Sequence, residues 1–176
     1  MNNKSFLVIA FSVLLIFGCS GARYSVSKKT LKENYVSGKS GLRIKIPNGW
    51  FQAFDAGEND SDIWLVSDDY SSSIKFTLIT FDSKGNNLHD AVEISKAANK
   101  VLYGDPVGFK NKETGNKNML AYEILKNGKL FSYVIVFNIN GKFYECKSEF
   151  ADDLTEEKRG KVISIQKLLT DNLFNL

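Results

Sequence analysis

Three β-rich runs joined by Asn-Gly pairs constrain the fold of this chain more than any other feature. The runs cover residues 121–126, 129–138 and 142–150. Asn127-Gly128 and Asn140-Gly141 connect them, and both residue types tolerate the positive φ angles of a type I′ turn. The second half of the chain is therefore predicted to form an antiparallel meander, with residues 109–113 paired along one edge.

Shorter strands are predicted ahead of the meander. Residues 42–46 alternate apolar and basic side chains, which is typical of a half-buried strand. Residues 63–66 are all apolar. In residues 73–81 the side chains of Ile74 and Phe76 fall on one face, so this run is expected to cover a core.

A helix is predicted between these strands and the meander. Asn87 opens it and Asp90 completes a capping-box pair, while Gly104 and Pro106 end it. Its apolar face is expected at the residues that recur at three- and four-residue steps, namely Leu88, Ala91, Ile94, Ser95, Ala98, Val101 and Leu102.

A second helix is predicted at the C-terminus. It is expected to begin after Asp153, with Glu156 as the capping partner three residues on. Its buried stripe is predicted at Leu154, Val162, Ile165, Leu169 and Leu173. Two helices that cover an antiparallel sheet of about six strands define an α+β fold, an αβα sandwich. Because no βαβ series occurs, a Rossmann-type parallel sheet is excluded.

Composition limits the partners and the chemistry. Of the 176 residues, 43% are hydrophobic, which suits one domain with a core of its own. The formal net charge of +3 is too small to indicate a nucleic-acid partner. Two cysteines and one histidine exclude a disulfide-rich scaffold and a His-rich metal cluster, and no cofactor is expected.

The N-terminal segment is typical of a secretory signal. Lys4 supplies a positive charge, and an apolar run extends from residue 6 to residue 17. As a helix this run rises roughly 18 Å, well short of the ~30 Å hydrocarbon core of a bilayer. Polar, Gly-containing sequence follows at once, so the run is predicted to be the apolar region of a signal peptide.

The end of this run carries a recognisable motif. Residues 15–19 read Leu-Ile-Phe-Gly-Cys. They resemble the lipobox of bacterial lipoproteins, with the aliphatic Ile16, the small Gly18 and the cysteine that follows the cleavage site. The resemblance implies a signal peptide of residues 1–18, cleaved between Gly18 and Cys19. It also implies that Cys19 carries a diacylglyceryl group and an amide-linked acyl chain, which would anchor the protein in a lipid bilayer.

A second cleavage site is present close by. Residues 20–22 read Ser-Gly-Ala, so an ordinary signal peptidase could instead cut after Ala22 and discard the cysteine. With the lipobox interpretation, residues 19–40 form a lipidated tether and residues 41–176 form a single globular domain. Ser20 stands where lipoproteins retained in the inner membrane carry an aspartate. By that resemblance the expected location is the outer membrane, facing the periplasm.

The layout of the domain resembles a known sandwich. The matching features are residues 42–50, which end in Ile-Pro-Asn-Gly-Trp, the mid-chain helix, the meander and the C-terminal helix that ends at Leu173-Phe174. They resemble the domain shared by the DcrB-like lipoproteins, the PsbP photosystem proteins and a Ran-binding nuclear import factor. Members of that family assist, dock or scaffold other proteins and share no catalytic residues. The resemblance therefore implies a non-catalytic accessory role and binding to another envelope protein, not an enzyme.

Individual side chains support few other functions. His89 is the only histidine and is expected to be an exposed helix residue, so a hydrolase acting through it is disfavoured. Cys146 is expected to be a small buried hydrophobic residue. Trp50 is expected to pack in the core. Trp64 lies in a run that is apolar on both faces and could line a pocket for a small or lipidic ligand between sheet and helix, which is the alternative function.

An acidic stretch gives the weak candidates for a metal site. They are Asp55, Glu58, Asp60 and Asp62. Clustered carboxylates can bind Ca²⁺, but the spacing here does not match an EF-hand loop. A solvated acidic loop without a metal is therefore expected.

Overall fold

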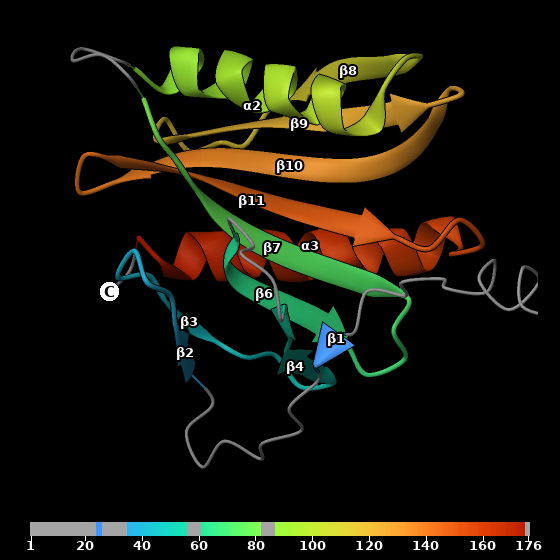
Figure 1. Cartoon of the computed structure of the whole chain (residues 1–176), viewed down its shortest axis with the longest axis horizontal. Helices are drawn as coiled ribbons and strands as arrows, with labels where there is room; N and C mark the ends of the chain where they lie inside the picture. The colour runs from blue at the N-terminus through green and yellow to red at the C-terminus, as the bar shows by residue number, and fades with distance from the viewer. Residues whose placement is uncertain (1–23, 26–34, 56–60, 82–86, 175–176) are drawn as a thin grey trace, which may run out of the picture.

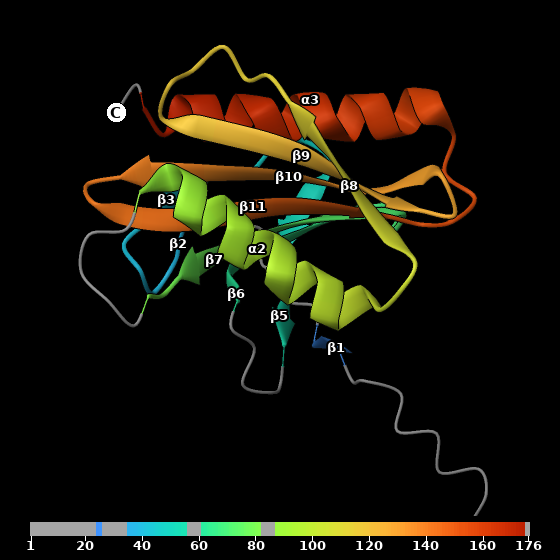
Figure 2. The same cartoon turned by 90° about the horizontal axis from the view of Figure 1, so that it is seen from above.

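One antiparallel sheet and two helices make up most of the described chain. The computed structural model describes residues 24–25, 35–55, 61–81 and 87–174. Helix α2 (Leu88–Tyr103) covers one face of a seven-stranded sheet and α3 (Glu156–Asn172) covers the other (Figures 1 and 2). The predicted α+β sandwich is confirmed, with seven strands in the sheet where about six were expected.

The predicted meander forms one half of the sheet. The strand order is β4 (Trp50–Gln52), β6 (Ser61–Ser67), β7 (Ser72–Ile79), β11 (Lys142–Phe150), β10 (Lys129–Ile139), β9 (Met119–Lys126) and β8 (Val107–Lys112). Asn127 and Asn140 have φ angles of 53°, as their type I′ turns require. The run predicted at the edge lies in β8, which pairs with β9 alone in this sheet.

The run at residues 42–46 forms a strand outside this sheet. β3 (Arg43–Lys45) pairs with β2 (Tyr35–Ser37), and β5 (Phe54–Asp55) pairs with β1 (Tyr24–Ser25). The side chains of Val36 and Ile44 are buried in the core on the α3 side of the sheet. The β2–β3 hairpin is thus part of the folded unit, although β2 falls within the residues assigned to the tether.

The two helices begin differently. At α2 the prediction holds, because the Asn87 side chain accepts hydrogen bonds from the backbone N–H groups of His89 and Asp90, and Asp90 accepts one from Asn87. The predicted start of α3, directly after Asp153, is two residues early, because the helix begins at Glu156. Leu154 is drawn into the core, so the helix begins later, and Thr155 caps it by accepting a hydrogen bond from the backbone N–H of Lys158.

The face that α2 buries is turned from the predicted one by roughly 60° around the helix. The predictions for Ala91 and Ser95 are confirmed, and Leu88 packs against the smaller core. Ala91, Val92, Ser95 and Asn99 are buried. The predicted core residues Ile94, Ala98, Val101 and Leu102 are instead exposed. The reason lies in the sheet, which presents polar side chains to α2 and so receives the polar positions of the helix.

Two cores result from the strict alternation of the strands. The larger core lies under α3 and includes Phe76, Ile135, Phe137 and Leu169. The smaller core lies under α2 and consists of Ala91, Val92, Tyr122, Ile124, Val134 and Val136. The α3 stripe is confirmed at Leu154, Val162 and Leu169, which are buried, and Ile165 and Leu173 are half-buried.

Candidate functional site

Charged and polar side chains meet between α2 and the sheet. In β11, Glu145, Lys147 and Glu149 point toward α2, while the residues between them point toward α3. Along α2, Ser95, Asn99 and Tyr103 follow one another at four-residue steps, which places them on one face. The helix and the strand therefore present matching rows of polar groups, which we call the α2 network.

The inner part of the α2 network surrounds Glu145. Its carboxylate accepts hydrogen bonds from Asn99 Nδ2, at 3.0 Å, and from the Ser95 hydroxyl. Lys147 Nζ donates to Asn99 Oδ1 at 3.1 Å. The Tyr122 hydroxyl lies 2.6 Å from Ser95 Oγ and 3.0 Å from Asn99 Nδ2. Burial and the nearby Glu145 raise the pKa of Tyr122, so its hydroxyl stays protonated.

The outer part of the network surrounds Glu149. Lys75 Nζ lies 2.9 Å from one carboxylate oxygen, and the Tyr103 hydroxyl donates to the other at 2.5 Å. Lys147 Nζ lies 3.6 Å away. Burial alone would raise the pKa of Glu149, but the two ammonium groups outweigh it and hold the pKa below its ordinary value. Burial and Glu149 together raise the pKa of Tyr103.

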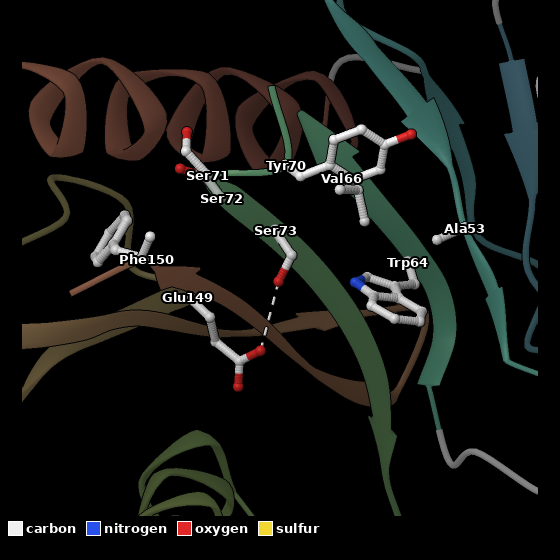
Figure 3. Close-up of a pocket in the computed structure, with 10 residues that line it drawn as sticks. Ala53, Trp64, Val66, Tyr70, Ser71, Ser72, Ser73, Glu149 and Phe150 are labelled. Carbon is white, nitrogen blue, oxygen red and sulfur yellow. Dashed lines mark hydrogen bonds between the residues drawn. The ribbon is translucent and has the colours of Figure 1, made fainter. Parts of the chain in front are cut away.

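A cavity of about 410 Å³ opens beside Glu149, over β6, β7 and β11 (Figure 3). It is lined by Ala53, Trp64, Val66, Tyr70, Ser71, Ser72, Ser73, Glu149, Phe150 and Ala151. Figure 3 shows the Ser73 hydroxyl directed at Glu149, and the two atoms are 3.4 Å apart. The volume lies within the range of ligand pockets, and mostly apolar walls with a few polar groups are typical of them.

Lys75 connects the cavity to the α2 network. Its ammonium group lies 5.0 Å from the centre of the Trp64 ring and also pairs with Glu149. This cation–π contact holds the indole against the sheet at one side of the cavity. On the other side, Tyr70 follows β6 with a φ angle of 58° and packs edge-on against Phe51, with ring centroids 5.6 Å apart.

The residues singled out in the sequence lie in separate places. Trp64 lines the cavity, and Trp50 packs at the margin of the α3-side core. His89 lies exposed in the first turn of α2. Cys146 is fully buried on the α3 side, where burial raises the pKa of its thiol well above the ordinary value and suppresses thiolate chemistry.

The acidic candidates are only partly within the described residues. Glu58 and Asp60 lie outside them, as do Gly18 and Cys19, and Asp55 belongs to β5. Asp62 fastens the β2–β3 hairpin, because it accepts hydrogen bonds from the backbone N–H of Ser40, at 2.8 Å, and from the Ser40 hydroxyl. Within the described ranges, no three His, Cys, Asp or Glu side chains are grouped so that they could hold a metal ion.

The α2 network was not predicted from the sequence. The burial of Cys146 is confirmed, but no role was predicted for Glu145, Lys147 and Glu149, which alternate with it along β11. The signal that could have found the network is the coincidence of two polar rows. Ser95 and Asn99 stand four residues apart on one face of the predicted helix, and Glu145 and Lys147 alternate inside a predicted strand of the meander.

The arrangement of the sheet and helices is that of the PsbP-like class of sandwiches. A solved structure that shares it is the solution structure of cyanobacterial PsbP (CyanoP) from Synechocystis sp. PCC 6803, with a TM-score of 0.53 and 15% sequence identity. The match covers 84% of this chain and 95% of that one. At this identity the likeness establishes the fold alone. No protein-family model matches the chain, and no curated protein matches it significantly.

The helices of the described residues were also compared with the requirements of a membrane span. None of them is both long and apolar enough to cross a bilayer.

Proposed function

We propose that this protein is a lipid-anchored accessory protein of the bacterial cell envelope that binds another envelope protein through the outer face of α2. The observation that carries the proposal is an apolar stripe on that face. Ile94, Val101 and Leu102 are 42%, 87% and 64% exposed, and Ala98 lies exposed between them. The solvent side of a surface helix is ordinarily polar, so a stripe of this kind indicates a contact surface.

The spacing of the stripe indicates what kind of partner fits it. The four side chains stand at positions i, i+4, i+7 and i+8, which is the pattern by which a helix inserts into an apolar groove. The stripe is not needed to hold α2 in place, because the opposite side of the helix already makes the α2 network and the smaller core. We therefore assign the stripe to a groove on another protein.

Site-specific crosslinking in intact cells tests this docking. A photoreactive amino acid at Val101 should give one dominant protein adduct. The matched control is Leu168, an isolated apolar residue of α3 that is also exposed, at 60%. Leu102→Ser should weaken the adduct at position 101. Equal labelling from positions 101 and 168, or no adduct from either, would contradict the proposal.

The anchor requires a separate test, because Cys19 lies outside the described residues. The proposal rests here on the lipobox resemblance of residues 15–19. Metabolic labelling with a palmitate analogue should mark the wild-type protein and leave Cys19→Ala unmarked. A mature protein that begins after Ala22 and carries no label would remove the anchor from the proposal and leave the docking surface untouched.

A second candidate function is binding of a small molecule. The cavity beside Glu149 favours it, because its volume and its mostly apolar lining match those of ligand pockets. This candidate does not depend on the partner of α2.

A further inference from the structure

We propose that the cavity binds a small molecule with an apolar body and a neutral or cationic hydrogen-bond donor, and that Glu149 selects the donor and rejects anions. The proposal rests on the second candidate function, ligand binding, and makes it specific. It is independent of docking through α2.

The walls of the cavity fit an apolar or aromatic body. Trp64 and Val66 project from β6, and Ala53 and Tyr70 also line the cavity (Figure 3). Trp64 is already positioned by Lys75, so the indole does not have to become ordered when a ligand arrives. A preformed wall reduces the entropy cost of binding.

The polar side of the cavity is set by Glu149. A carboxylate has about four acceptor positions. In Glu149, Tyr103 occupies one oxygen at 2.5 Å and Lys75 the other at 2.9 Å. Ser73 reaches the same oxygen as Lys75 at only 3.4 Å, which is the longest of these contacts. A donor on a ligand can take the place of this weak bond without disturbing the two strong ones.

The charges explain the rejection of anions. Lys75 and Lys147 neutralise Glu149, but neither of them is among the residues that line the cavity. Among the lining side chains, an entering headgroup therefore meets the carboxylate of Glu149 and the hydroxyl of Ser73. A neutral donor or an ammonium group gains a charge-assisted hydrogen bond there, whereas a carboxylate or phosphate meets a like charge.

Three probes that differ only in the headgroup test this selectivity. They are 2-phenylethylamine, 2-phenylethanol and phenylacetate, titrated into the full-length protein at neutral pH. The readout is the NMR signal of the Trp64 indole N–H, assigned with Trp50→Phe. Trp50 packs on the other side of the sheet and serves as the internal control. The amine and the alcohol should shift the Trp64 signal, and the acid should bind at least tenfold more weakly.

Two variants locate the effect. Glu149→Gln should bring phenylacetate within about threefold of the alcohol, while Glu123→Gln should leave the ranking unchanged. Glu123 is a matched control, because it also pairs with a lysine, Lys112, at 2.7 Å, but it does not line the cavity. Ser73→Leu should fill the cavity and weaken both binding probes at least tenfold.

Each outcome decides one of the two claims. Equal binding of all three probes to the wild type would overturn the selection by Glu149 and leave ligand binding standing. No shift of Trp64 with any probe would overturn ligand binding at this cavity altogether. If Glu149→Gln does not fold, the ranking in the wild type and the loss in Ser73→Leu still decide both claims.

Discussion

The two faces of the sheet hold their helices by different means. Under α3 the buried polar side chains bond to main-chain carbonyls: Gln166 Nε2 donates to the carbonyl oxygens of Tyr133 and Cys146, at 3.1 and 2.7 Å. Under α2 the buried polar side chains bond to titratable groups, such as Glu145 and Glu149. The α3 contact therefore depends mainly on apolar burial, while the α2 contact also depends on charge and on pairing.

This difference has consequences for what a substitution does. Apolar burial is non-directional, so its loss scales with the volume removed. A buried charge that loses its partner retains its desolvation cost. The α3 face should thus be most sensitive to changes of size and the α2 face to changes of charge. The exposed stripe lies on the α2 side, where the helix covers only part of the sheet, and so do Trp64, Ser73 and Glu149 of the cavity lining (Figures 1 and 2).

The largest expected effect is the loss of a large side chain under α3. Phe137 is fully buried and contacts Phe76, Tyr144 and Phe174 through its ring. Phe137→Ala should lower the free energy of unfolding by about 3–5 kcal/mol, because it leaves a cavity among rings that cannot close around it. Urea unfolding followed by circular dichroism measures the change.

The matched control for that substitution is the adjacent residue of the same strand. Val136 is also fully buried but points toward α2. Val136→Ala removes less volume and should lower the free energy of unfolding by about 1–2 kcal/mol. If the two substitutions had equal effects, the α3-side core would not be the main apolar support of the fold.

The next largest effect is expected from a change of charge under α2. Lys147 is 10% exposed in its side chain and lies 3.9 Å from Glu145 and 3.6 Å from Glu149. Lys147→Met keeps the apolar stem and leaves two carboxylates with one ammonium group fewer. The free energy of unfolding should fall by about 2–4 kcal/mol.

A double substitution checks that this loss comes from charge and not from packing. Lys147→Met combined with Glu145→Gln removes one charge of each sign, so the double variant should be more stable than the sum of the two single effects predicts. Strict additivity in this double-mutant cycle, measured by urea unfolding, would contradict the charge explanation.

The sequence predicted one of these faces better than the other for a physical reason. Alternating apolar residues report burial directly, so the α3 side was predicted from Ile74, Phe76 and the C-terminal stripe. A glutamate or lysine in a strand has the same pattern whether it faces water or a polar helix. Glu145 and Lys147 therefore carried no local sign of burial, and only part of the buried face of α2 was predicted as a result.

The cavity illustrates the same limit. Trp64 was identified as a pocket candidate because its strand is apolar on both faces, and the structure places it in the wall of a cavity. Its companions Ser73 and Glu149 come from strands that are adjacent only in the folded sheet. Their meeting depends on the pairing of β7 with β11, which connects residues far apart in the chain and is not evident in any local pattern.

Acidification should affect the α2 side selectively. The pKa of Glu149 is lower in the folded protein than its ordinary value of 4.5. The sign follows from linkage: the stabilisation by this carboxylate is complete above the unfolded pKa and is lost as the pH falls through the folded pKa. Unfolding free energies should therefore decrease below about pH 4.5, and Glu149→Gln should flatten part of that decrease.

Asp69 provides the comparison for the pH experiment. Hydrogen bonds from Ser71 and Ser67 hold its pKa at about 2, so it contributes in the same direction at lower pH. Asp69 is exposed and lies in a turn. Asp69→Asn should reduce the slope mainly between about pH 3.8 and 2, whereas Glu149→Gln should reduce it from about pH 4.5 downward. The reverse result would place the acid sensitivity in the turn instead of the α2 network.

The smallest expected effect compares the caps of the two helices. Asn87 accepts two backbone hydrogen bonds, at 2.8 and 3.1 Å, while Thr155 accepts one at 3.4 Å. Asn87→Ala should lower the free energy of unfolding by about 1 kcal/mol, and Thr155→Ala by about half of that.

Hydrogen exchange of the backbone N–H groups in the first turn of each helix gives the more specific readout. Because α2 rests on the smaller apolar core, loss of its cap should speed exchange along the helix, while loss of the α3 cap should affect only the first turn. If the faster exchange extended equally far along both helices, the larger apolar core under α3 would not stabilise that helix against the loss of its cap.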